Sequence, residues 1–231
     1  MRLFSYDGGV MKSLSKFTDC ISLSLLFLIS CIPVFTIGTA MAATYHTAYK
    51  VLRHDRGYLF REYVSAFREN FKQTTPVWLL AFALGTLLGV DGFIVGYYAQ
   101  KGSVPSALGI VFIVGMIVWF SWISYLFPYM ARFENTKKQS MKNAILFAMV
   151  HFPMTILLLF LAAVVGFLMY IMPFLAAMLP AFYSWVTCFI LEHVFRKYMT
   201  EEQRQEEDER NRKNYDCLFW RLSPVVCLLG C

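Results

Sequence analysis

Charged side chains are scarce in this sequence. Only 16% of its 231 residues are charged, against roughly 25% in soluble domains, whereas 58% are apolar, against roughly 45–50%. A water-soluble fold of this size cannot bury so much apolar surface. The composition therefore argues against a soluble enzyme, a disordered chain and a secreted disulfide scaffold. It favours a polytopic membrane protein whose main contact is the lipid bilayer.

Three long stretches hold almost no charge. Residues 20–49 and 143–191 have none, and 73–131 has only Asp91 and Lys101. A spanning helix needs roughly 20 apolar residues, so the second and third stretches each have room for two. Their apolar runs are continuous, unlike the alternating pattern of barrel strands. We predict an all-α membrane helix bundle with four secure spans, at 74–98, 106–130, 144–170 and 174–194.

The first apolar segment, residues 20–52, is interrupted. Pro33 and Gly38 break it after 13 apolar residues, and a helix of that length rises only about 20 Å, which is short of a full crossing. We therefore predict a broken hairpin of two helices, 20–32 and 39–52. A single kinked crossing is the alternative, and a cleaved signal peptide is a third interpretation.

Basic residues are concentrated in alternate connections. Lysines and arginines recur within 50–72 and 132–142 and after residue 194, whereas the other connections hold only Lys101. By the positive-inside rule, the basic loops and the C-terminus should face the cytoplasm. The net charge of +6 is then a consequence of topology, and we expect no nucleic-acid partner.

The basic segment 58–72 has the pattern of an amphipathic helix. Phe60, Tyr63, Phe67 and Phe71 share one face at helical spacing, with charged residues on the other. Such a helix either lies at the headgroup boundary or docks another membrane protein. Its four aromatic residues are candidate docking positions, together with two residues of the next basic loop, Arg132 and Glu134.

A polar cluster marks the return half of the broken segment. Pro33 lacks a backbone donor, the Thr36 hydroxyl can serve backbone groups freed by the break, and Gly38 can adopt positive φ. His46 lies further on, among several threonines. These four residues are candidate structural or ligand-lining positions. Hydrogen bonding between helices is the simpler interpretation.

The sequence has no recognisable enzyme motif. It lacks HExxH, GxSxG, P-loop and GxGxxG patterns, and its six cysteines form no CxxC pair. Asp91 and Glu192 lie near helix ends, where we expect them to be solvated. We therefore expect no enzymatic activity, no cofactor and no metal. Cys217, Cys227 and Cys231 lie in a tail to which we assign no role.

Four ordered motifs resemble the YesL-like family of bacterial membrane proteins. They are Phe4-Ser5-Tyr6-Asp7-Gly8-Gly9, Cys31-Ile32-Pro33-Val34-Phe35-Thr36-Ile37-Gly38, Ala66-Phe67-Arg68-Glu69-Asn70-Phe71-Lys72-Gln73-Thr74 and Ala131-Arg132-Phe133-Glu134-Asn135-Thr136. The resemblance covers residues 1–198. The tail, 199–231, is first charged and then apolar, and its apolar end departs from the family.

The resemblance implies a multi-pass plasma-membrane protein of a Gram-positive bacterium, with no established activity and no defined catalytic residues. Family members are often encoded beside sugar-binding proteins and permeases of carbohydrate uptake systems. This association implies an accessory subunit that works with the permease or ATPase subunits of an ABC-type transporter. The alternative is a small-solute transporter or channel, because discontinuous helices like the broken first segment often form substrate sites.

Overall fold

The computed structural model describes residues 9–54, 57–100, 106–133 and 136–199, with isolated positions at 201, 204, 205 and 209. Within these residues the chain is all-helical, as predicted. The α-helices are α1 (Gly9–Ser30), α2 (Ile37–Thr47), α3 (Leu59–Gln100), α4 (Ser106–Arg132), α5 (Lys137–Val150), α6 (Phe152–Ile171) and α7 (Leu179–Tyr198). Shorter helical turns are the 3-10 helix η1 (Val34–Thr36), the π-helix η2 (Ala48–Arg53) and the 3-10 helix η3 (Pro173–Ala177).

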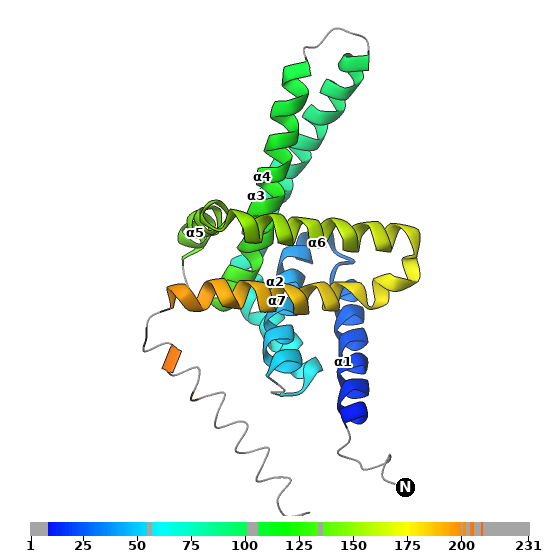
Figure 1. Cartoon of the computed structure of the whole chain (residues 1–231), viewed down its shortest axis with the longest axis vertical. Coiled ribbons are helices and arrows are strands. Elements are labelled where there is room, and N and C mark those ends of the chain that lie inside the picture. Colours follow the sequence, from blue (N-terminus) through cyan, green and yellow to red (C-terminus); the bar gives the residue numbers. More distant parts are fainter. Residues whose placement is uncertain are drawn as a thin grey trace, which may run out of the picture.

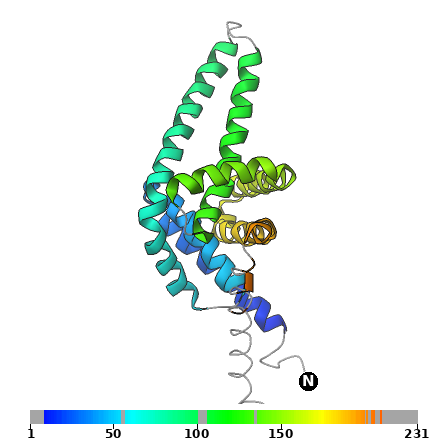
Figure 2. The same ribbon diagram turned by 90° about the vertical axis from the view of Figure 1, so that its left-hand side faces the viewer.

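Among the described residues, the helix pairs α3–α4 and α6–α7 each form a hairpin next to a common core, as Figures 1 and 2 show. Helices α3 and α4 extend together from the core, whereas α6 and α7 lie side by side across that direction (Figures 1 and 2). The core lies where α2, α4 and α7 meet the first part of α3. Large buried side chains there include Tyr45, Trp78, Leu126, Phe127 and Phe195.

In the part of the chain that the structure describes, three helices are long and apolar enough to cross a membrane: Leu59–Tyr98, Gly109–Arg132 and Phe152–Ile171. They contain the predicted span 74–98 and most of the predicted spans 106–130 and 144–170. The most apolar windows of α3 and α6 are only 6% and 11% buried inside the protein. Their side chains therefore face outward, as expected for helices surrounded by lipid.

The fourth predicted span, 174–194, is not among these candidates. Its first residues form η3, and α7 begins only at Leu179. Four residues of the last two turns are ionisable: Glu192, His193, Arg196 and Lys197. The apolar part of α7 is thus shorter than a bilayer crossing requires. The prediction of four secure spans was wrong because it counted apolar residues across the Pro173 and Pro180 helix starts.

The predicted helix 144–170 also differs, because it breaks at His151. This residue has φ −105° and ψ 49°, which ends α5, and α6 begins with Pro153 in its first turn. Proline has no backbone N–H, so residue 153 cannot donate to the Met149 carbonyl four residues earlier, and its ring crowds that carbonyl, which interrupts the helix there. The Thr155 hydroxyl lies 2.8 Å from the Ala148 carbonyl oxygen and 3.1 Å from that of His151. It therefore serves the Ala148 carbonyl, whose helical partner is lost at the break, while the His151 carbonyl also accepts from the Thr155 N–H.

The amphipathic segment 58–72 and the predicted span 74–98 form one continuous helix, α3, with Pro76 inside it. Its 42 residues correspond to about 63 Å at the standard rise, twice the thickness of a bilayer core. The first part of α3 must therefore extend beyond the hydrocarbon if the second part crosses it.

The first apolar segment forms two helices that run in opposite directions, α1 and α2 (Figures 1 and 2). Between them Pro33 is extended, with φ −79° and ψ 116°. The Thr36 hydroxyl lies 2.6 Å from the carbonyl oxygens of both Ser30 and Pro33. This arrangement has the form of the predicted broken hairpin, not of a single kinked crossing. Neither α1 nor α2 is among the candidate spans. The depth of this hairpin in the membrane therefore stays a prediction.

Gly38 was predicted to adopt positive φ, but the structure shows a different role for it, which is close packing between helices. It lies inside α2, and Gly57 is the described glycine with positive φ. A Cβ atom at Gly38 would stand 2.5 Å from Trp78 Cβ and 2.7 Å from Phe127 Cε1. The glycine therefore allows α2 to approach α3 and α4 closely.

Gly38→Ala should lower the melting midpoint in detergent, because overpacking a tight contact costs about 1–3 kcal/mol. Gly89→Ala in α3 is the matched control, since no described neighbour lies within 4 Å of a Cβ added there. Alanine should leave that helix unchanged or stabilise it by up to about 1 kcal/mol. Size-exclusion recovery after heating measures both variants. Equal midpoints would show that α2 does not depend on this contact.

Candidate functional site

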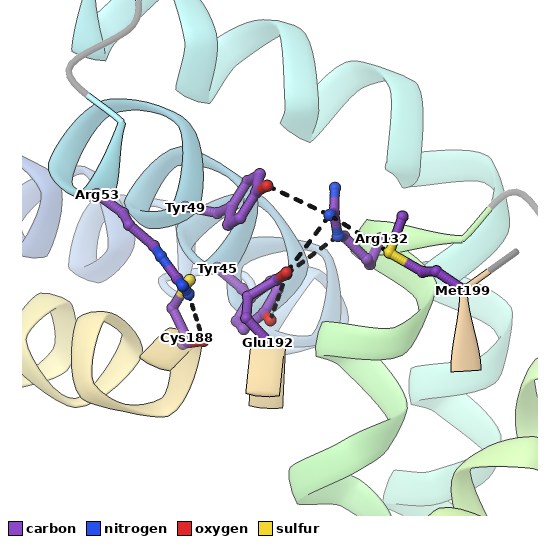
Figure 3. A network of polar contacts seen from close by, with 7 residues as sticks. All are labelled: Tyr45, Tyr49, Arg53, Arg132, Cys188, Glu192 and Met199. Atoms are coloured by element: carbon purple, nitrogen blue, oxygen red, sulfur yellow. Dashed lines mark hydrogen bonds and ion pairs between the residues drawn. The ribbon is translucent and has the colours of Figure 1, made fainter. Parts of the chain in front are cut away.

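A buried charge network joins α2, η2, α4 and α7 (Figure 3). Glu192 is its acid and is only 1% exposed. On α7 the buried residues Cys188, Leu191, Glu192 and Phe195 recur at helical spacing, so Glu192 lies on the face that packs against the core. The expectation that Glu192 is solvated was therefore wrong. That prediction used only the position of Glu192 near the end of the helix and took no account of the helix face on which it lies.

Arg132 is the partner of this acid. It is the last residue of α4, and its Nε lies 3.0 Å from Glu192 Oε1. Its Nη2 lies 3.4 Å from Oε2, so the guanidinium meets both carboxylate oxygens. The Nη2 contact is a charge-assisted hydrogen bond, which is stronger than a neutral one, and the short Nε distance adds ionic attraction without a well-aligned hydrogen bond. The positive charge also lies at the C-terminus of α4, where the helix dipole favours it.

Two tyrosines surround this ion pair. The Tyr45 hydroxyl donates to Glu192 Oε1 at 3.4 Å, and Arg132 Nη2 donates to the Tyr49 hydroxyl at 3.2 Å. The Arg132 guanidinium also lies over the Tyr49 ring, 4.4 Å from its centroid. A cation over an aromatic face is attracted by the ring quadrupole. The pair is therefore supported from one side by α2 and η2.

Arg53 brings a second cation to the network. It lies at the end of η2, donates from Nη1 to the Cys188 carbonyl oxygen at 3.2 Å, and stands 4.8 Å from the Phe189 ring centroid. Tyr45, Tyr49 and Arg53 are four residues apart, so the helical backbone directs all three toward α7. None of these three residues was among the predicted site residues, although their common spacing is visible in the sequence.

The electrostatics of Glu192 reflect a balance between burial and charge. Burial raises the pKa of Glu192, and the positive charges of Arg132 and Arg53 oppose that shift. A buried acid without such partners would take up a proton. Both carboxylate oxygens are occupied by contacts that connect helices, so the arrangement is suited to fixing helix positions. Within the described ranges, no group of three His, Cys, Asp or Glu side chains could hold a metal ion.

The predicted ligand-lining residues do not form one site. Pro33, Thr36 and Gly38 lie at the turn into α2, whereas His46 lies two helical turns further on, about 12 Å away along the axis. His46 is half-buried, and burial lowers its pKa, with Lys50 adding to the shift. The turn that contains Pro33, Thr36 and Gly38 and the side chain of His46 therefore lie too far apart to line one ligand site.

The threonines of α2 all make hydrogen bonds, and one of them connects α2 to another helix. The Thr39 hydroxyl lies 2.9 Å from that of Thr74 and 3.1 Å from that of Thr75, which joins α2 to α3. Thr44 and Thr47 donate to carbonyl oxygens one turn earlier in α2. Such hydroxyl contacts are typical of packed membrane helices.

The predicted docking residues divide into exposed and buried positions. Phe60 is 66% exposed, whereas Tyr63 is 2% exposed and packs in a second core cluster with residues of α1 and α2. Phe67 and Phe71 are half-buried. Arg132 lies in the charge network and not on a docking surface, and Glu134 lies outside the described residues. Periodicity identified the aromatic face, but that face packs largely on the protein itself.

Part of the chain is similar to a known protein family. Residues 20–92 match the protein family described as Protein of unknown function, DUF624. This region contains α2, most of α3, and the three network residues Tyr45, Tyr49 and Arg53, and it ends before Arg132 and Glu192. No curated protein and no solved structure matches the chain. Residues 20–92 of this membrane protein are therefore similar to the DUF624 family over about the first third of the chain.

Proposed function

We propose that the protein is a non-enzymatic accessory subunit of the bacterial plasma membrane, associated with ABC-type carbohydrate uptake. Its partners would be permease or ATPase subunits of the transporter. The sugar-uptake part of this proposal is supported by the resemblance to the YesL-like family. The matching family is described as of unknown function, and the structure supports the proposal through the charge network and the exposed surface.

The main support for the proposal is that Glu192 is buried and that both of its carboxylate oxygens have partners within the protein. Transporters and pumps use intramembrane acids that face a water-filled pathway or a substrate. Here Glu192 is almost fully buried, and its two oxygens meet Arg132 and Tyr45. A carboxylate held in this way supports a fixed helix arrangement. This favours an accessory role over the alternative of a small-solute transporter or channel.

The docking surface that we propose lies at the start of α3. Tyr58 and Phe60 are 76% and 66% exposed, and the neighbouring Arg61 and Arg68 are also exposed. Aromatic residues and arginine are enriched at protein interfaces. Because α3 is longer than a bilayer crossing, this end can project from the membrane and meet a partner subunit.

Phe60→Ala should reduce co-purification of transporter subunits while leaving the melting midpoint unchanged, because Phe60 has few contacts within the protein. Tyr63→Ala is the matched variant. It should lower the free energy of unfolding by about 3–5 kcal/mol, as other large-to-small changes of buried aromatic residues do. The measurement is affinity capture of tagged protein from gently solubilised cells grown on a complex glycan. If no permease or ATPase subunit is enriched with the parent protein, the accessory role fails.

The proposed orientation places the loops at 50–73 and 132–142 and the C-terminus in the cytoplasm, from the positive-inside rule. Cysteines introduced singly at Ser103 and Lys138, in a background without native cysteines, should then differ in their reaction with an impermeant thiol reagent. In intact cells the reagent should label position 103 and spare position 138. The reverse pattern would invert the orientation.

A further inference from the structure

Asp91 is the one charged residue in the apolar part of α3, residues 77–100. It was expected near the end of a helix, but α3 continues past it to Gln100, which adds about 14 Å at the standard rise. Tyr97 and Tyr98 follow Asp91 by about 10 Å along the axis. Because tyrosine is typical of the headgroup level of membranes, Asp91 lies deeper than that level.

The neighbouring helix α4 shows which environment surrounds this level of α3. A Cβ atom added at Gly92, the residue after Asp91, would meet the Phe112 ring of α4. Beside Phe112, the side chains of Val111 and Ile113 are apolar and more than half exposed. Exposed apolar side chains on both helices indicate hydrocarbon at this level. In the orientation proposed above, this level belongs to the outer half of the bilayer.

Asp91 does not face α4. The face of α3 that contacts α4 contains Gly85 and Gly92, where an added Cβ atom would meet aromatic rings of α4. At 100° per residue, Asp91 lies roughly 110° around the helix from this face. Its side chain is exposed, and it forms no hydrogen bond or ion pair within the described ranges. Ionisable residues inside membranes almost always face other helices or water and pair with a partner, so a partner of Asp91 must come from outside these ranges.

Asp91 lies in a seam of exposed residues along α3. The members follow one another at alternating spacings of four and three residues, as in the contact positions of coiled coils. The seam consists of Leu80, Leu84, Leu87, Asp91, Ile94 and Tyr98, and its apolar members are 43–60% exposed. Helix pairs in membranes commonly pack in this way, and a single polar residue in such a seam fixes the register of the pair. The seam therefore has the pattern of a contact surface for one further helix.

Charge decides which helix fits the seam. Two copies of this chain in the same orientation would bring two Asp91 carboxylates to one depth, where like charges repel. The apolar helices α4 and α6 carry no charge except Arg132, at the other end of α4. Lys101, the next cation in the sequence, comes after the end of α3. A second copy therefore does not supply the missing cation from these helices.

We propose that the seam docks a membrane helix of another protein that carries a lysine or arginine at the depth of Asp91. The two side chains form an ion pair in the outer half of the bilayer, and the apolar seam residues pack on either side of it. Buried charged residues that pair across an interface provide specificity as well as attraction. This contact is separate from the surface at Phe60 and does not depend on a role in sugar uptake.

The test supplies the cation on a second copy of the full-length chain. Asp91→Lys places a lysine at the right depth, because both copies insert in the same orientation. Copies with different tags are co-expressed and purified in maltoside detergent. The parent should retain the Asp91→Lys variant roughly fivefold better than it retains a second parent copy. With Asp91→Glu in place of the parent this retention should persist, and with Asp91→Asn it should be lost.

Val118→Lys, at an exposed position of α4, is the matched control, and the parent should retain it no better than a second parent copy. A second measurement leaves the chain unchanged. A transmembrane leucine–alanine peptide with one central lysine, in phosphatidylcholine vesicles, should show energy transfer with the labelled parent and not with Asp91→Asn.

The proposal is overturned if the Asp91→Lys and Val118→Lys variants are retained equally, or if the lysine peptide binds the parent and Asp91→Asn equally. Cross-linking between two Leu87→Cys copies that both keep Asp91 would assign the seam to a second copy of the chain, and would also overturn it.

Discussion

A charge in the apolar interior of a protein costs several kcal/mol unless a partner compensates it, and Glu192 meets this constraint by pairing with Arg132. The pair has a structural consequence because its members lie far apart in the sequence. Arg132 ends α4, so the end of α4 must meet the inward face of α7. Tyr45 and Tyr49 then fix α2 and η2 against the same point. Apolar contacts alone are non-directional and would not set these positions.

Hydroxyl groups solve a second problem, which the helix breaks create. At the break near Pro33 the Thr36 hydroxyl meets the carbonyl oxygens of Ser30 and Pro33. At the break near Pro153, Thr155 has the same role, and Ser24 serves the start of α7 from a neighbouring helix. Unsatisfied backbone groups are costly where water is absent. A chain with few charges therefore uses Ser and Thr to stabilise the ends of its helices.

Composition and apolar run length were enough to predict the all-α fold and the spans in α3 and α4. They did not predict the break at His151, because a single proline is often tolerated inside a membrane helix. They also gave one span too many, since a count of apolar residues does not show that Glu192 and the following charges end the apolar part of α7. Gly38 was identified as special, but its reason, the contact with Trp78, depends on tertiary packing.

The charge network was the least predictable feature. Its acid was noted in the sequence only for its depth near a helix end. The spacing of Glu192 from Cys188, Leu191 and Phe195 places it on the face of α7 that packs against the core. This spacing would have predicted a buried Glu192 instead of a solvated one. The identity of its partner depends on how α4 and α7 pack, and spacing within one helix carries no information about that.

A double-mutant cycle on Arg132 and Glu192 tests the central claim most directly. Removing one partner of a buried pair costs about 3–5 kcal/mol, whereas replacing both by apolar residues is often neutral. Arg132→Met and Glu192→Leu should therefore each lower the melting midpoint in detergent by roughly 10 °C. The double variant should recover most of that loss. If the double variant instead loses the sum of the two single changes, the two residues do not act as a pair, and the buried ion pair does not hold α4 against α7.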